Sequence, residues 1–141
     1  MSDQMKTNHQ DYILKPLNQF TTTGQINAIV NLCHGCSKDA GWWQGVPTPD
    51  VPTPIINTKL LLMVTEIAEA TEGVRKDLMD DKLPHRKMVE VELADALIRI
   101  CDLAGAMDMD LGGAVAEKLA FNATRDDHRL EVRAATGGKK F

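Results

Sequence analysis

The sequence lacks a long apolar run, and this absence argues against a membrane protein. No segment approaches the roughly 18 consecutive apolar residues that a helix needs to span a bilayer. Residues 1–11 are polar and do not contain the apolar segment of a signal peptide. We therefore expect a cytoplasmic protein that has no membrane partner.

An excess of basic residues is also missing. The chain has 16 lysines and arginines against 20 aspartates and glutamates, which gives a net charge of -4. Proteins that bind nucleic acids generally carry a basic stripe that neutralises phosphates. The charge therefore argues against a nucleic-acid polymer as partner, but it is compatible with a small anionic ligand held through a metal ion.

Cysteine is scarce, and several catalytic motifs are absent. Three cysteines, an odd number, suit a reducing compartment better than a disulfide framework. The segment Cys33-His34-Gly35-Cys36 is similar to a zinc or redox motif, but no second ligand pair accompanies it. A glycine-rich phosphate loop and the local motifs of Ser-His-Asp hydrolases are missing as well.

The alternation of apolar and polar residues that is typical of strands does not persist anywhere, so we predict an all-α fold. A chain of 141 residues suits one domain. The periodicity places helices at about 25–40, 58–78, 85–107 and 111–135. We predict an N-terminal arm over 1–22, a helical domain over 23–135 and a basic tail over 136–141. Four prolines in residues 44–57 predict an extended loop, either a lid or a surface connector.

The predicted helix at 58–78 carries a pair of carboxylates beside its expected core face. That face consists of Leu60, Met63, Val64, Ile67, Ala70 and Val74. Glu66 and Glu69 are three residues apart, so they share one side of the helix. Leu62 and Gly73 lie on the same stripe, which indicates that the carboxylates face protein or a crevice.

The predicted helix at 85–107 is apolar on most sides, which predicts burial within a bundle or against a partner subunit. Its charge is concentrated on one narrow stripe formed by Glu92, Asp95, Arg99 and Asp102. This stripe is either the strip that contacts solvent or the wall of an internal site.

The two carboxylate pairs could together hold a cation. The four residues concerned are Glu66, Glu69, Glu92 and Asp95. Converging carboxylates repel one another unless a cation lies between them, and oxygen ligands suit Mg²⁺, with Mn²⁺ as a substitute. The alternative is that these acids are ordinary helix residues, since one Glu-x-x-Glu pair alone is a weak signal. The lack of a Glu-x-x-His pair argues against a di-iron bundle.

Polar and aromatic residues flank this region. Lys118, Asn122 and Arg125 share one side of the last predicted helix and could donate to phosphate oxygens, or simply contact solvent.

Upstream lie His34, Lys38, Trp42 and Trp43, around the end of the first predicted helix. A tryptophan can stack on a nucleobase or anchor a loop in the core. Because neighbouring side chains diverge, we expect one tryptophan in the core and the other near a ligand. Lys38 could reach a phosphate, or only solvent.

The order of these motifs closely resembles the MazG-like, all-α nucleoside triphosphate pyrophosphohydrolases. Two helices with carboxylate pairs are followed by Lys-x-x-x-Asn-x-x-Arg at 118–125. The segment at 34–43 and the end of the chain at 122–141 also look like those of small phage and bacterial members. The resemblance covers about residues 22–141.

The resemblance implies a four- to five-helix bundle whose helices pair across the subunit interface of a homodimer or homotetramer. It also implies Mg²⁺-dependent hydrolysis of a (deoxy)nucleoside triphosphate to the monophosphate and pyrophosphate, with water attacking the α-phosphorus. The metal ligands would be Glu66, Glu69, Glu92 and Asp95. Either Glu66 or Glu69 would be catalytic as the general base. The substrate-binding residues would be His34, Lys38, Trp42, Trp43, Lys118, Asn122 and Arg125.

One position differs from the family pattern, because Thr65 stands where members commonly have a further acid. A helical wheel points Thr65 away from Glu66, so we expect metal binding to persist. Two other functions are open at this point: a nucleotide-binding relative that does not catalyse, and a helical interaction module whose acids are solvated. The sequence does not determine the preferred base, the number of metal ions, or the choice between dimer and tetramer.

Overall fold

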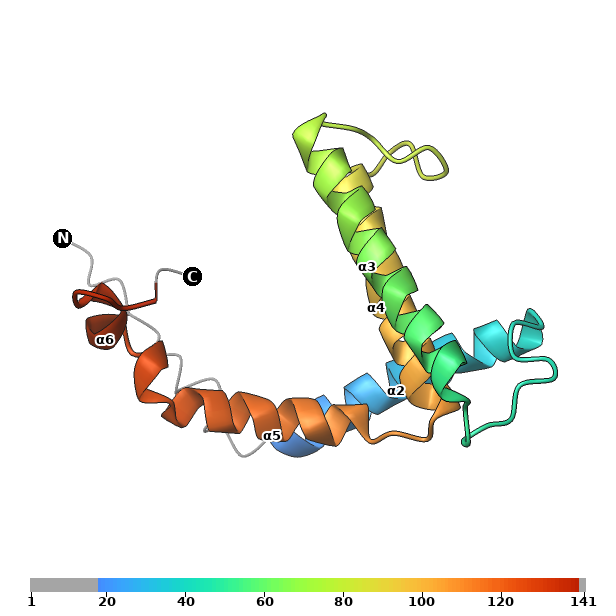
Figure 1. The fold of residues 1–141 in the computed structure, drawn as a ribbon, viewed down its shortest axis with the longest axis horizontal. Coiled ribbons are helices and arrows are strands. Elements are labelled where there is room, and N and C mark those ends of the chain that lie inside the picture. The colour runs from blue at the N-terminus through green and yellow to red at the C-terminus, as the bar shows by residue number, and fades with distance from the viewer. Residues whose placement is uncertain (1–17, 140–141) are drawn as a thin grey trace. The chain divides into compact units, whose positions relative to one another are not determined.

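The computed structural model describes residues 18–139, and this part of the chain is helical with no β-strand, as predicted. Its elements are α2 (Asn18–Asp39), α3 (Thr53–Arg75), α4 (Met88–Ala106), α5 (Leu111–Thr124), the 3-10 helix η1 (Asp126–His128) and α6 (Leu130–Ala134) (Figure 1). None of these helices combines the length and the apolar character that a membrane span requires.

The described residues belong to two compact units, and each is considered by itself. Residues 27–110 form one unit, which contains most of α2 together with α3 and α4. The other unit contains the start of α2 and the chain from Leu111 onward. Most of the predicted N-terminal arm, and the last two residues of the predicted tail, lie outside the described residues. α2 begins at Asn18 rather than near residue 25, so the last residues of that arm are helical.

The end of α2 is a glycine-capped turn. The N–H of Trp42 donates to the carbonyl of Ser37 (3.1 Å), and the N–H of Gly41 donates to that of Lys38 (2.9 Å). This pair of bonds is the Schellman motif, and Gly41 has the positive φ of 85° that the motif requires. The cap fixes the direction in which the two tryptophans leave the helix.

α3 and α4 form an antiparallel helical hairpin (Figure 1). Asp80 fixes the connecting turn: its backbone N–H donates to the carbonyl of Arg86 (3.0 Å). Its buried carboxylate accepts the backbone N–H groups of Lys82 (3.0 Å) and Leu83 (2.5 Å). The turn is thereby held by groups that lie within it.

α3 begins at Thr53 instead of near residue 58. Pro52 is the N-cap residue and Pro54 lies in the first turn, where the missing N–H of proline is not needed. The last two prolines of the predicted loop therefore start a helix. The remainder of the loop is anchored, because Val51 is buried in the core against Trp43.

The predicted core face of α3 is confirmed only in part. Ala70 is buried and Met63 is half-buried against the core, but Leu60, Val64, Ile67 and Val74 are exposed. The side of α3 that meets α4 carries Glu66, Ala70 and Gly73 instead. The physical reason is close approach: a Cβ on Gly73 would lie 3.0 Å from the Cβ of Met88, so the hairpin packs along small residues.

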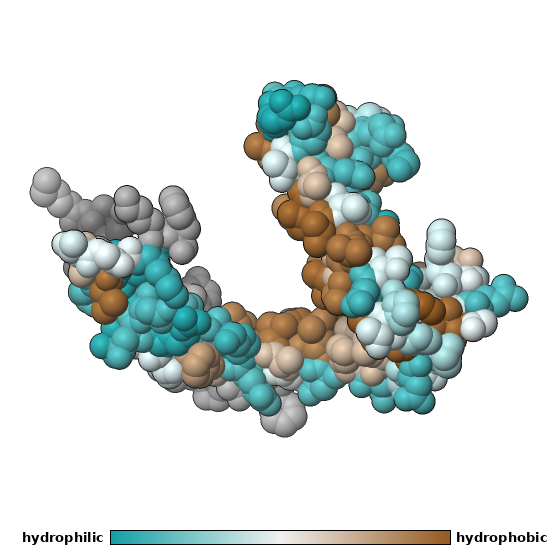
Figure 2. Space-filling view, viewed as in Figure 1, coloured by the Kyte–Doolittle hydropathy of each residue, from teal (hydrophilic) through white to brown (hydrophobic). Residues whose placement is uncertain are grey.

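Large apolar side chains of α4 are also exposed within the single chain. Leu93, Leu97, Ile98 and Ile100 are all between 40% and 53% exposed. Figure 2 shows the resulting apolar surface along the α3–α4 hairpin. The core of this unit is small and lies at the base of the hairpin, where Trp43 packs with Val51, Leu103 and Ala106.

The other unit differs from the prediction of one helix over 111–135. The helix is interrupted at Arg125 and again at Arg129, whose backbones are extended. The hydroxyl of Thr124 donates to the carbonyl of Phe121 (2.8 Å), and such local side-chain bonds compete with helix propagation. Arg125 therefore lies beyond the end of α5 and not on its face.

Candidate metal and ligand site

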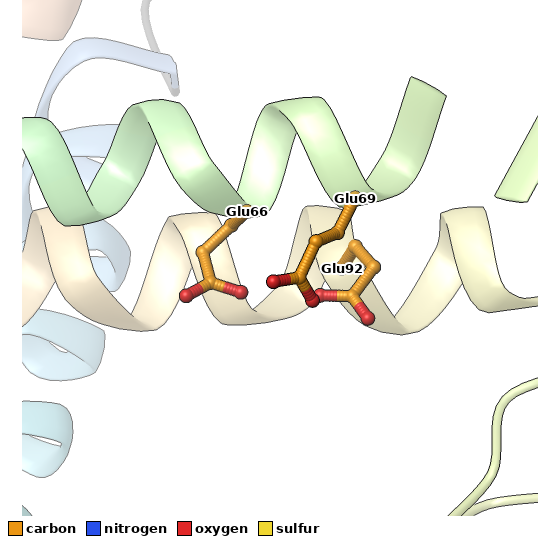
Figure 3. Close-up of side chains that lie close together, drawn as sticks. All are labelled: Glu66, Glu69 and Glu92. Atoms are coloured by element: carbon orange, nitrogen blue, oxygen red, sulfur yellow. The ribbon is translucent and has the colours of Figure 1, made fainter. Parts of the chain in front are cut away.

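Three of the four predicted metal ligands converge between α3 and α4. Carboxylate oxygens of Glu66, Glu69 and Glu92 all lie within 4.8 Å of one another. Figure 3 shows Glu66 and Glu69 reaching from α3 towards Glu92 on α4. Glu66 and Glu92 are buried, whereas Glu69 is exposed. We refer to these three residues as the carboxylate cluster.

Negative charges surround Glu92 and disfavour the ionisation of its carboxyl group. The pKa of Glu92 is raised to about 7, chiefly by burial and also by a hydrogen bond with Glu66 and the charges of Glu69, Glu66 and Asp95. A divalent cation would reverse these effects, because it favours the ionised carboxylates. The donor set, oxygen atoms only, fits Mg²⁺ or Mn²⁺.

Asp95 and Arg99 lie next to the cluster on α4. Asp95 is outside the group of converging oxygens, although its charge acts on Glu92. The Nε of Arg99 donates to Oε1 of Glu66 at 2.5 Å. This ion pair joins α4 to α3. Its guanidinium also compensates part of the cluster's negative charge.

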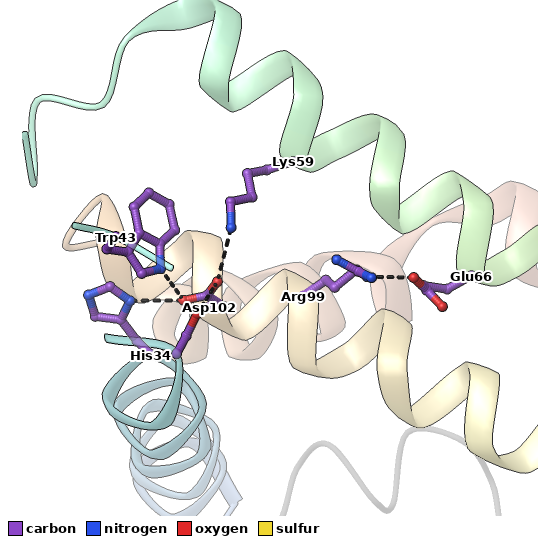
Figure 4. A network of polar contacts seen from close by, with 7 residues as sticks. His34, Trp43, Lys59, Glu66, Arg99 and Asp102 are labelled. Atoms are coloured by element: carbon purple, nitrogen blue, oxygen red, sulfur yellow. Dashed lines mark hydrogen bonds and ion pairs between the residues drawn. The ribbon is translucent and has the colours of Figure 1, made fainter. Parts of the chain in front are cut away.

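A second group of polar contacts surrounds Asp102, which lies about three turns beyond Glu92 along α4 (Figure 4). Its Oδ1 accepts the Nε1–H of Trp43 (2.7 Å) and contacts Nδ1 of His34 (3.0 Å). Its Oδ2 accepts the hydroxyl of Ser37 (3.0 Å) and pairs with Nζ of Lys59 at 3.6 Å. The carboxylate is 9% exposed, so it is buried with a partner at each oxygen. We call Asp102 and these four partners the Asp102 network.

The Asp102 network depends on the close approach of α2 and α4. A Cβ at Gly105 would lie 2.5 Å from the Cβ of His34, so only glycine fits there. The His34 ring meets the edge of Trp43 at a centroid distance of 5.6 Å. Lys59 places its ammonium 4.4 Å from the centre of the Trp43 ring, a cation–π contact. The network therefore ties α2, α3, α4 and the tryptophan segment together.

A cavity of about 670 Å³ is lined by Asp102 and by Asp95 and Arg99, the two neighbours of the cluster, whereas the three cluster glutamates are not among its lining residues. Charged residues on its wall are Lys59, Asp95, Arg99 and Asp102, and apolar ones include Leu62, Ile98 and Trp42. A cavity of this size and mixed lining can accept a small polar molecule that has a flat apolar part.

The two tryptophans diverge as predicted. Trp43 is 6% exposed and belongs to the core, whereas Trp42 is 74% exposed and lines the cavity. His34 and Trp43 contact the cavity wall through Asp102 and do not line the cavity themselves. Lys38 is exposed in the last turn of α2 and is not among the lining residues.

The three predicted phosphate donors belong to the other unit. Lys118 is exposed, with its ammonium over the ring of Phe121. Among the described residues, Oδ1 of Asn122 is buried without a hydrogen-bond partner. Arg125 makes two hydrogen bonds to Asp127, at 2.9 and 2.7 Å.

The sequence placed Arg99 and Asp102 on a stripe that could form the wall of an internal site, but it gave them no role, and Lys59 was not predicted at all. Arg99 and Asp102 continue the α4 stripe of Glu92 and Asp95 at helical spacing, which was a usable signal. Lys59 precedes Glu66 by two turns on the same side of α3, but its own surroundings in the sequence are apolar. Thr65 is exposed, and its hydroxyl donates to the carbonyl of Leu62 (2.7 Å).

No protein-family model matches the chain, and no curated protein or solved structure matches it significantly.

Proposed function

We propose that the protein is a Mg²⁺-dependent nucleoside triphosphate pyrophosphohydrolase of the MazG-like, all-α type. The observation that carries this proposal is the convergence of Glu66, Glu69 and Glu92, which Arg99 links to a cavity that Lys59 and Trp42 also line. The order of motifs along the sequence is the second support. The proposed location is the cytoplasm, and the proposed substrate is a free nucleotide.

The carboxylate cluster would hold the metal, with Asp95 as a neighbouring ligand. A bound Mg²⁺ would neutralise phosphate oxygens and make a coordinated water more acidic, and Mn²⁺ could replace it. Glu69 is the better general base of the two predicted, because it is exposed whereas Glu66 is engaged by Arg99. In the proposed reaction, the water oxygen bonds to the α-phosphorus, pyrophosphate leaves, and the water's proton passes to Glu69.

The cavity would take the nucleotide, with its base, sugar and phosphates. Trp42 offers an exposed ring for stacking, and Lys59 and Arg99 offer donors for anionic oxygens. His34 and Trp43 would shape this wall through Asp102. Lys38, Lys118, Asn122 and Arg125 stay proposed substrate contacts, and Asp127 would fix the orientation of the Arg125 guanidinium.

A second copy of the chain would cover the apolar hairpin surface. Exposed leucine, isoleucine and valine side chains lie on both α3 and α4, and contiguous apolar surface of this kind marks protein interfaces. Two hairpins would then form a four-helix bundle, in a homodimer or homotetramer. Analytical ultracentrifugation should give a mass of two or four chains, and Leu97→Glu should shift it towards one.

The test is pyrophosphate release from each canonical and several modified deoxynucleoside triphosphates, with Mg²⁺ and with a chelator. Glu69→Gln should abolish release while the helical circular dichroism persists. Glu72→Gln is the matched control, because Glu72 lies one turn further along α3 and pairs with Arg75 and Lys76 on the surface.

The outcomes separate three functions. Mg²⁺-dependent release that is lost in Glu69→Gln supports the hydrolase. Mg²⁺-dependent nucleotide binding without release would favour the non-catalytic relative. The exposed apolar helices also fit an interaction module, which would show neither signal.

A further inference from the structure

Arg99 lies at the junction between the carboxylate cluster and the cavity. Its Nε contacts Glu66 at 2.5 Å (Figure 4), and the same side chain is among the residues that line the cavity. The Arg99 side chain is 40% exposed, whereas that of Glu66 is 8% exposed. A buried carboxylate is thus paired with a guanidinium that extends towards solvent.

Among the ion pairs between described residues, this is the one that reaches the carboxylate cluster. Glu66 is therefore the cluster member with a side-chain counterion, while Glu69 and Glu92 have none there. A guanidinium stays charged at any physiological pH and carries five N–H donors in one plane. While Nε contacts Glu66, the group still has terminal donors for a second anion.

A divalent cation on Glu66 would compete with Arg99 for the same carboxylate. The metal ion and the guanidinium would repel each other beside one carboxylate. This repulsion favours release of Arg99, whose long side chain is partly exposed. An arginine side chain has several rotatable bonds, and the cavity into which that of Arg99 would turn is the one proposed for the nucleotide. A polyphosphate there offers the bidentate oxygens that guanidinium groups bind best.

We propose that Arg99 is an exchangeable counterion: it neutralises Glu66 when no metal is bound, and it transfers to a substrate phosphate when the metal and the nucleotide bind. This inference rests on the proposed function. Arg99 then couples the two binding events, because its release from Glu66 by the metal makes it available to the nucleotide. It acts as a positioning residue for the polyphosphate.

The first test measures metal binding without nucleotide, by calorimetric titration of Mn²⁺ and of Mg²⁺ into the full chain. Arg99→Ala removes the competitor and should tighten metal binding about 5- to 20-fold, within the usual range for coupled sites. Arg99→Lys keeps a competing charge and should bind metal as the wild type does. Arg86→Ala is the matched control, since Arg86 precedes α4 and pairs with exposed Glu90.

The second test measures the nucleotide side. Arg99→Ala should raise KM for the triphosphate at least about 10-fold with a smaller change in kcat, whereas Arg86→Ala should change neither. Arg99→Lys should recover part of the loss in KM, since an ammonium binds phosphate without the bidentate geometry.

Unchanged or weakened metal affinity in folded Arg99→Ala would overturn the inference even if the wild type is an active hydrolase. If the alanine variant does not fold, Arg99→Gln applies the same test, because it removes the charge and keeps a hydrogen-bond donor. A wild type that neither binds the metals nor releases pyrophosphate would overturn the proposed function together with this inference.

Discussion

The carboxylate cluster and the Asp102 network lie on the same side of α4 but differ in how their charge is compensated. Asp102 has donors at both oxygens, supplied by α2, α3 and the tryptophan segment. In the cluster, two glutamates are buried, and among the described residues Arg99 is the side chain that forms an ion pair with it, through Glu66. One region stabilises the fold, and the other retains negative charge that a ligand can neutralise. Opposite responses to loss of a carboxylate should distinguish them.

The largest effect is expected at Asp102. Asp102→Ala would leave the buried Nε1–H of Trp43 without its acceptor and remove the ion pair with Lys59. The free energy of unfolding should therefore fall by about 3 kcal/mol. Urea unfolding followed by circular dichroism measures this change. Asp95→Ala, on the same stripe but exposed, is the control and should change stability by less than about 0.5 kcal/mol. A loss below about 1 kcal/mol at Asp102 would remove the contrast between the two regions.

The cluster should respond in the opposite direction. Glu92→Gln removes a buried charge that its neighbours oppose, so the metal-free protein should gain roughly 1–2 kcal/mol at pH 8. The same variant should lose the stabilisation that Mg²⁺ gives the wild type, measured as a shift in Tm with and without the ion. Glu90→Gln, on the exposed side of the same helix, is the control. A marked loss of stability in metal-free Glu92→Gln would show that the charge is compensated after all.

The pH dependence follows from Glu92. Its pKa rises from an ordinary value of 4.5 to about 7, chiefly because it is buried. The folded protein therefore binds more protons than the unfolded chain between these values, and its stability should fall as the pH rises from 4.5 to 7. Added Mg²⁺ should oppose this fall, because it binds the ionised form and gains affinity as the pH rises. Thermal unfolding at pH 5, 6, 7 and 8, with and without Mg²⁺, measures both trends. Equal Mg²⁺ stabilisation at pH 5 and pH 8 would contradict the cluster as the metal site.

The smallest effect concerns an acid that belongs to neither region. Asp108 follows α4 with a positive φ of 52°, and the N–H of Met109 bonds to the carbonyl of Ala104 (2.9 Å) in a Schellman turn. Glycine adopts this conformation without strain, so Asp108→Gly should stabilise the protein by about 0.5–1 kcal/mol. Urea unfolding at two ionic strengths should show the same gain, because the effect comes from the backbone. A strongly salt-dependent change would indicate that the charge of Asp108 matters.

The helical class and much of the site follow from the sequence, because both depend on helical periodicity. Residues three or four apart share a side, so the pairs at Glu66 and Glu92 could be placed together before the structure was known. The face of α3 that packs against α4 could not be predicted from the sequence. It depends on how closely two helices approach, and that distance is set by Gly73 and Ala70 rather than by the larger apolar residues.

The Asp102 network shows a second limit of prediction. Its partners come from three separate elements, and His34 and Lys59 have no spacing in the sequence that relates them to Asp102. Local signals were also overridden by context at Pro54, which starts α3 although it reads as part of a loop. Contacts between elements, and the caps that orient them, carry the information that periodicity lacks.

The divergence of the two tryptophans gives the protein an internal optical probe. Trp43 is buried, bonded to a carboxylate and covered by an ammonium, while Trp42 is 74% exposed on the cavity wall. The chain has no other tryptophan, so its fluorescence comes from one shielded and one solvated indole. The solvated component should emit at longer wavelength and be quenched by acrylamide. A ligand that binds in the cavity should therefore change the fluorescence of Trp42, so binding can be measured without a label and without turnover.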